Sequence, residues 1–142
     1  MGRNRTLNQK IKDERRERIL SAGLRLFATK GISATKIADI SSALGISQGL
    51  VYHYFRSKEE IFTELIRSAF EKMNSACRYL ESLDLPPLEK IGMAIKELLN
   101  GIEKDEDTPL YHLLIALATS SEAVPEDTKT IIRSENTLPY EV

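Results

Sequence analysis

Apolar residues recur along this chain at the three- and four-residue spacing of amphipathic helices. Gly31, Gly45 and the break at 84–87 divide the pattern into segments. The predicted helices cover about 12–30, 36–44, 47–55, 58–83, 88–102 and 109–120, with a further short helix from Pro125. The pattern therefore predicts an all-α fold.

Residues 35–58, TKIADISSALGISQGLVYHYFRSK, contain two short helical patterns that meet at one glycine. Gly45 can supply the positive φ of a tight turn without steric cost, and Ser47 is a good N-cap for the helix that follows. A helix-turn-helix is therefore predicted over 36–55. Either Ser33 or Thr35 is expected to cap its first helix.

The second helix of this motif carries more exposed polar and aromatic groups than packing needs. Only Val51 and Phe55 are required for the core, which leaves Gln48 and three aromatic rings outside it. The second helix of a helix-turn-helix lies in the major groove of DNA with its N-terminal residues at the base edges. We therefore expect this helix to be presented to DNA.

A long fourth helix follows. Ser57 and Glu60 form a capping box that fixes its start, and a helix of about 25 residues is on the order of 37 Å long. That length can connect a DNA-binding head, residues 13–73, to a second domain, residues 74–142. Residues 1–12 are basic with few apolar positions, and we expect them to form a mobile arm.

Charge is segregated along the chain. Residues 1–58 carry 12 Lys and Arg against 4 Asp and Glu, whereas residues 59–142 carry 8 against 17, which together return the net charge of −1. Such asymmetry suggests that the first part meets a polyanion and the second does not.

The motif also resembles a known family. Its residues match the TetR family of bacterial transcriptional regulators specifically over 13–73 and thinly afterwards. The matching positions are Thr35, Ile40, Gly45, Ser47, Gly49, Tyr52, Phe55 and Lys58, preceded by Leu26, Phe27 and Gly31. The resemblance implies a repressor that binds a palindromic operator as a homodimer and is released by a small apolar effector. It also implies a location in the bacterial cytoplasm, at the nucleoid when bound to the operator.

The resemblance assigns roles to residues of the motif. Phosphate contacts are expected from Thr35, Lys36, Tyr52 and Lys58. Base readout is expected from Ala38, Gln48, Gly49, Leu50, His53 and Tyr54. Gln can pair with adenine through two hydrogen bonds, Leu suits a thymine methyl, and Gly allows close approach of the backbone.

Family members usually continue for several more long helices, which complete a ligand pocket and a dimer interface. This chain has about half of that second domain, so we expect either a truncated product or a short variant that assembles differently. Without the missing helices, the apolar faces at 88–102 and 109–120 should self-associate, together with the segment 125–142, or leave a monomer that binds DNA weakly.

Other classes of function find no support in the sequence. There is no catalytic constellation, cofactor motif or metal-ligand spacing; the two histidines are far apart, and the acidic run 103–107 lacks the glycine of a calcium loop. No apolar run approaches a membrane span, and the first ten residues, MGRNRTLNQK, lack the apolar core of a signal peptide. The alternative that stays open is a helical interaction or apolar-ligand-binding module without DNA binding.

Overall fold

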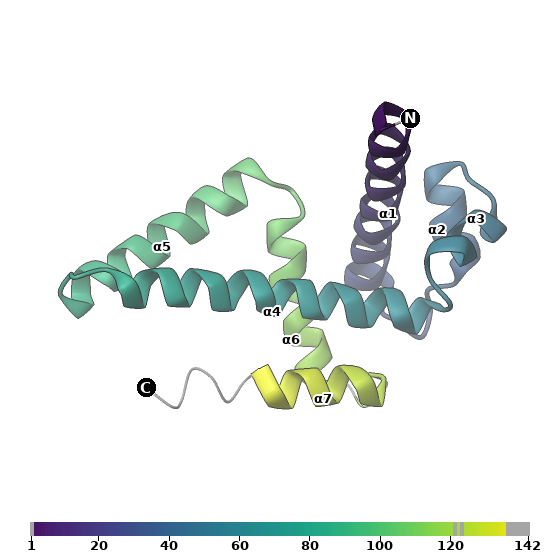
Figure 1. The fold of residues 1–142 in the computed structure, drawn as a ribbon. Helices are drawn as coiled ribbons and strands as arrows, with labels where there is room; N and C mark the ends of the chain where they lie inside the picture. Colours follow the sequence, from purple (N-terminus) through teal and green to yellow (C-terminus); the bar gives the residue numbers. More distant parts are fainter. Residues whose placement is uncertain (1, 121, 123, 136–142) are drawn as a thin grey trace.

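The structure is a computed structural model that describes residues 2–120, 122 and 124–135, and every regular element within these ranges is an α-helix (Figure 1). The helices are α1 (Gly2–Lys30), α2 (Ile37–Leu44), α3 (Gln48–Tyr54), α4 (Lys58–Ser82), α5 (Pro87–Lys104), α6 (Thr108–Ser120) and α7 (Glu126–Glu135). The predicted all-α fold is confirmed. Expectations that concern residues 136–142 lie outside the described residues.

The head packs α1, α2 and α3 around the beginning of α4. Leu24 of α1, Ile40 of α2, Val51 of α3 and Leu65 of α4 are each 0% exposed, and they lie in one hydrophobic cluster. Gly31 ends α1 in the left-handed region with φ 79°, and its N–H donates to the Phe27 carbonyl at 2.9 Å. The apolar stripes of four helices therefore meet in one core.

The second domain is joined to this core by α6. Leu114 and Ala118 of α6 and Val124 beyond it belong to the same buried cluster as the head residues. Ser21 Oγ donates to Asp107 Oδ2 at 2.7 Å, and Arg25 Nε donates to Asp107 Oδ1 at 3.1 Å, which ties the start of α6 to α1. Helix α7 packs on α4, where the Thr63 and Thr128 hydroxyls lie 2.8 Å apart.

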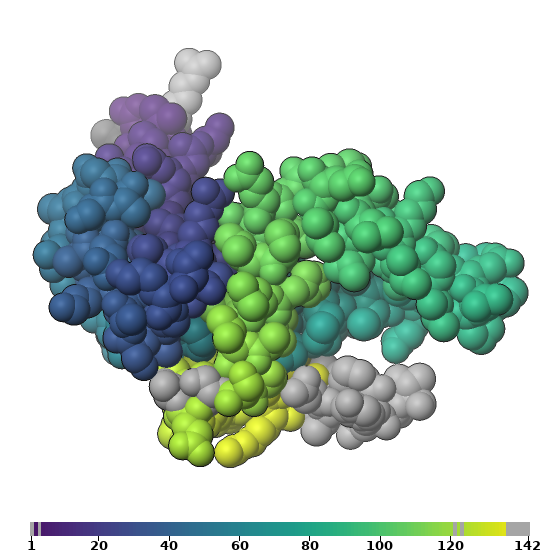
Figure 2. Space-filling model, turned by 180° about the vertical axis from the view of Figure 1, so that it is seen from behind, coloured from purple at the N-terminus to yellow at the C-terminus, as the bar shows by residue number. Residues whose placement is uncertain are grey.

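Helix α5 is packed differently from the others. It runs back from the far end of α4 toward α1, and none of its residues is buried (Figure 1). Seen from behind, α6 lies between the head and the projecting α5 (Figure 2). In the described second domain, α6 and α7 therefore pack on the head and α4, whereas α5 makes few contacts with either.

The expectation that the first helix starts at about residue 12 is wrong, because α1 is helical from Gly2. Between Gly2 and Gly23 the sequence contains no Pro or Gly, so the packed part of α1 can propagate a helix toward the N-terminus at little cost per residue. Thr6 Oγ1 donates to the Gly2 carbonyl, and Gln9 Nε2 donates to Asp13 Oδ1, both at 3.0 Å. The side chains described in this extension are exposed.

The crossing of α1 over α4 depends on the absence of a side chain at Gly23. A Cβ placed there would lie 2.8 Å from Cγ2 of Ile61, which is 0% exposed. Nothing lies within 4 Å of the corresponding position at Gly92 in α5. The two glycines therefore separate the steric effect of a methyl group from its effect on helix propensity.

We expect Gly23→Ala to be less stable than Gly92→Ala by about 1–3 kcal/mol, because only the first forces buried side chains to move. Both changes gain up to about 1 kcal/mol of helix propensity, so this gain cancels in the comparison. Chemical denaturation of the two variants measures the difference. Equal stabilities would contradict the close contact of α1 with α4.

Candidate nucleic-acid interface

The turn between α2 and α3 has the geometry that the sequence predicts. Gly45 lies in the left-handed region with φ 65°, and its N–H donates to the Ser42 carbonyl at 3.2 Å. Ser47 is the N-cap of α3, and its hydroxyl accepts the Leu50 N–H at 3.1 Å. The helix-turn-helix is therefore closed by a glycine and a capping serine.

Helix α3 is fixed from its inner side and exposes its outer side. Val51 is 0% exposed and Phe55 2% exposed, and both lie in the core of the head. The opposite face carries three of the six residues expected to read bases, together with Tyr52, which is expected to contact a phosphate. Gln48, Gly49, Tyr52 and His53 are exposed there. A helix anchored on one side and polar on the other can enter a groove without unfolding.

The remaining residues proposed for base readout are less open. Leu50 on α3 and Ala38 on α2 are half-buried. Tyr54 is also half-buried and packs against the core, with its ring edge-to-face with His53 at a centroid distance of 5.4 Å. Among Leu50, Ala38 and Tyr54, it is the Tyr54 ring that packs against the core of the head.

The start of α2 differs from the expectation that Ser33 or Thr35 caps it. The N-cap is Lys36, whose backbone N–H donates to Asp39 Oδ2 at 2.8 Å. This hydrogen bond, followed by the bond from Lys30 at 3.2 Å, holds the pKa of Asp39 below its usual value. The carboxylate three residues into the helix thus serves as the cap.

The side chain of Thr35 is buried in the head instead of capping α2. It is 0% exposed, and its hydroxyl donates to the Gly31 carbonyl at 2.8 Å. Its side chain therefore does not share the surface on which Lys36 and Tyr52 are exposed.

Comparison with known proteins agrees with this geometry. Residues 19–65 match the family described as bacterial regulatory proteins, tetR family. The HTH-type transcriptional repressor KstR2 of Mycolicibacterium smegmatis is 37% identical over 91 residues, which cover 63% of this chain and 43% of that protein. The structure of the ketosteroid transcriptional regulator KstR2 of Mycobacterium tuberculosis superposes with a TM-score of 0.70 at 26% identity, over 89% of this chain and 63% of that one.

The head of this chain belongs to the TetR family. A TetR-family regulator from Bordetella parapertussis shares the fold, with a TM-score of 0.73 at 24% identity, over 86% of this chain and 61% of that one. The chain spans less than half of the length of the curated relatives compared here. The relatives named here are regulators, and the family match over 19–65 spans the whole helix-turn-helix.

Lys58 occupies an unexpected place in the TetR-family head. Its ammonium donates to the carbonyls of Ile32 at 2.7 Å, Thr35 at 2.9 Å and Ser33 at 3.3 Å. A lysine ammonium has three N–H donors, so all three are engaged within the protein. Lys58 therefore fastens the loop between α1 and α2 to the first turn of α4, a role that the sequence analysis missed.

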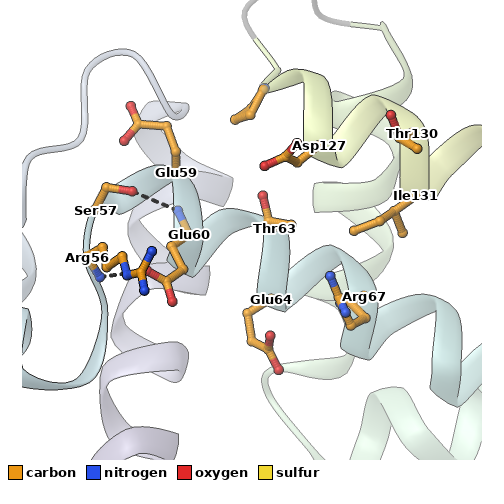
Figure 3. Close-up of a pocket in the computed structure, with 11 residues that line it drawn as sticks. Arg56, Ser57, Glu59, Glu60, Thr63, Glu64, Arg67, Asp127, Thr130 and Ile131 are labelled. Atoms are coloured by element: carbon orange, nitrogen blue, oxygen red, sulfur yellow. Dashed lines mark hydrogen bonds between the residues drawn. The ribbon is translucent and has the colours of Figure 1, made fainter.

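Further contacts fix α4 in the TetR-family head. Ser57 accepts the Glu60 N–H at 3.1 Å, as the capping pattern predicts (Figure 3). Glu60 accepts the backbone N–H of Arg56, one residue before the N-cap, at 2.7 Å. Arg16 of α1 lies 5.1 Å above the Phe55 ring and pairs with Glu64 at 3.2 Å. Part of the positive charge of α1 is thus used to hold the end of α3 against α4.

A polar cavity of about 640 Å³ opens between the start of α4 and α7 (Figure 3). Arg56 and Arg67 line it together with Glu59, Glu64 and Asp127.

Nowhere in the described ranges do three His, Cys, Asp or Glu side chains gather so that they could hold a metal ion. None of the described helices is long and apolar enough to cross a membrane.

Replacing Lys58 by Met should lower the free energy of unfolding by roughly 1–3 kcal/mol, because hydrogen bonds from a charged donor to three carbonyls are lost. Lys36→Met is the matched control, because the Lys36 side chain is exposed and its backbone cap is unchanged. Thermal and chemical denaturation without DNA measure both variants. Unchanged stability in Lys58→Met, with a weaker dependence of DNA binding on salt, would instead assign Lys58 to a phosphate.

Proposed function

We propose that this chain is a sequence-specific DNA-binding transcriptional regulator that represses by occupying a palindromic operator as a dimer. The observation that carries the proposal is α3, which is anchored by Val51 and Phe55 and directs Gln48, Tyr52 and His53 outward. The membership of the head in the TetR family and the repressor names of its relatives support it. In a bacterial cell it would act in the cytoplasm, at the nucleoid.

The roles at the DNA surface divide between phosphate and base contacts. Lys36 and Tyr52 are exposed and are proposed to contact phosphates. Because the Thr35 side chain is buried, its proposed phosphate contact is through the backbone amide. Lys58 is proposed to act indirectly, by holding the loop that carries Thr35 in place. Phosphate contacts fix register and carry no sequence information, which is left to the base-reading residues.

Base readout is proposed for Gln48, Gly49, Leu50 and His53, with Ala38 at the edge of the groove and Tyr54 in a lesser part. Gln48 stands in the first turn of α3, where a recognition helix meets base edges. Gly49 carries no side chain, and a Cβ there would meet only the Ser47 hydroxyl at 3.9 Å. The backbone at this turn can therefore approach DNA closely.

Release by an effector is proposed at an apolar cavity of about 460 Å³ between α4, α5 and α6. Ala69, Met73, Leu80, Met93, Leu98 and Ile115 supply most of its apolar wall. Lys72 lies at its polar side, 4.5 Å from the centroid of the Tyr111 ring, and desolvation by burial, followed by nearby carboxylates, raises the pKa of Tyr111. These features suit a small apolar molecule with one polar group.

The proposal is tested by titrating the chain with duplexes enriched from a random library over a range of salt concentrations. Neutralisation of phosphates predicts that log K falls linearly with log salt. Lys36→Ala should lower the magnitude of this slope by about one unit and weaken binding to all sequences alike. Lys129→Ala, on α7, is the control and should leave the slope unchanged. Absent or salt-independent binding would favour the module without DNA binding.

Gln48→Ala should relax the preference at one position of each half-site, worth about 1–3 kcal/mol of discrimination, because a bidentate contact to one base is lost. Selection from a random duplex library, followed by sequencing, compares the site profiles of the variant and the parent chain. The control is Gln9→Ala, which changes the other glutamine, exposed on α1. A profile that is the same for Gln48→Ala and the parent would remove Gln48 from base readout.

A further inference from the structure

Helix α1 extends well beyond the head that it supports. Every residue from Asn4 to Arg15 is exposed, and the first buried residue of the helix is Ile19. The N-terminal end of α1 projects past α2 and α3 in both views of the molecule (Figure 1, Figure 2). From Gly2 to Ile19 the helix rises by about 25 Å, at about 1.5 Å per residue. We call residues 2–15 the α1 overhang.

One face of the α1 overhang is basic. Arg5 and Lys12 are seven residues apart, which places them within about 20° of each other around the helix. Arg16 follows Lys12 by four residues, so the three side chains form one basic row. The acidic residues of this stretch lie about 80–180° around the helix from Arg5. They are Asp13, Glu14 and Glu17.

The basic row lies on the face of α1 that packs in the head. Ile19, Gly23 and Phe27 continue the row at three- and four-residue spacing, and Ile19 and Phe27 are each 1% exposed in the core. Arg16, where the row meets the head, lies 5.1 Å from the centroid of the Phe55 ring at the end of α3. The inward face of α1 therefore changes from apolar to basic at the point where the helix leaves the head.

The basic groups of α1 differ in whether the protein itself uses them. In the packed part, Arg16, Arg25 and Lys30 each pair with a carboxylate elsewhere in the chain at 3.1–3.2 Å. No described group of the chain forms a hydrogen bond or ion pair with the side chain of Arg5 or Lys12. The two charges of the basic row that lie on the overhang are thus open to a polyanion.

We propose that Arg5 and Lys12 bind phosphates of the DNA duplex beside the half-site that α3 reads. The proposal rests on the proposed function and adds to it a second contact outside the helix-turn-helix. From Arg16 to Arg5 the helix rises by about 16 Å, which is comparable with about five base pairs at 3.4 Å each. The overhang is therefore long enough to reach the backbone of the flanking duplex.

The pattern of the overhang favours DNA over a membrane surface. A helix that lies on a membrane needs a broad apolar face opposite its basic face. The overhang has two large apolar side chains, Leu7 and Ile11, roughly 120–160° around the helix from Arg5. Glu14 lies on the same side as these two residues, so the apolar face is narrow and carries a negative charge.

Titration of the full chain with one selected operator, as a duplex with long flanks and as a duplex trimmed to its half-sites, tests the proposal. Trimming should weaken binding by the parent chain, because the flanking phosphates are removed. Arg5→Gln combined with Lys12→Gln should lower the magnitude of the salt slope on the long duplex by up to about two units per bound protomer, since each neutralised phosphate contributes about 0.9 unit. Trimming should then cost this variant no further affinity.

The matched control is Lys10→Gln combined with Arg18→Gln. It removes the same charge from the same helix, and its two residues are exposed about 140° to either side of Arg5. This control should keep the slope of the parent and its loss of affinity on trimming, and circular dichroism checks that both double variants stay helical. Equal slopes for the two double variants would overturn the proposal.

The base composition of the flanks supplies a further check, because phosphate contacts carry no sequence information. Changing the flanks between A·T and G·C should leave the affinity of the parent unchanged; a preference for A·T would overturn phosphate binding in favour of the minor groove. A parent that binds the long and the trimmed duplex equally well would overturn the role of the overhang and leave the proposed function standing. A chain that binds neither duplex would overturn both.

Discussion

The Lys58 ammonium holds the loop between α1 and α2 against the first turn of α4. Its three carbonyl partners include that of Thr35, whose hydroxyl turns inward to Gly31. The same turn of α4 is capped by Ser57, and the end of α3 is pressed against it by Arg16 stacked on Phe55. Two charged side chains, Lys58 and Arg16, therefore help the apolar core to fix the position of α3 by binding the protein itself. The basic character of the first 58 residues is accordingly only partly available to DNA.

The second domain reaches the head through polar contacts, among them those of Asp107 and Thr128, and through a shared apolar core. Asp107 accepts hydrogen bonds from Ser21 and Arg25 of α1, and Leu114 shares the core of the head. Thr108 and Tyr111, which line the apolar cavity, lie one and four residues after Asp107. A change in that cavity would therefore act on α1 through a single helical turn. Under the proposed function, this short path would couple effector binding in the cavity to the head.

Local signals in the sequence predicted most of the fold and part of the candidate site. Gly45, Ser47 and Ser57 behave as expected because a turn or a cap is decided by residues a few positions apart. The roles of Lys58 and Thr35 were missed because they depend on tertiary contacts, with the Ile32 carbonyl 26 residues away from Lys58. The start of α1 was misplaced because a polar surface helix has no apolar stripe to reveal it. A family motif therefore predicts a DNA-binding surface but does not say which of its basic residues face inward.

Because α5 is exposed, we expect it to unfold locally at a lower free-energy cost than the core of α1 and α4. Amide hydrogens in the shared core of α1 and α4 can exchange with solvent only when the whole domain opens, whereas those of α5 can exchange by local opening. Its short connections at 83–86 and 105–107 join it to two well-packed helices. A protease that cuts α5 would thus leave the core of the head intact. Helix α5 can therefore open or be cut without unfolding of the head, and its own order depends on what packs against its exposed face.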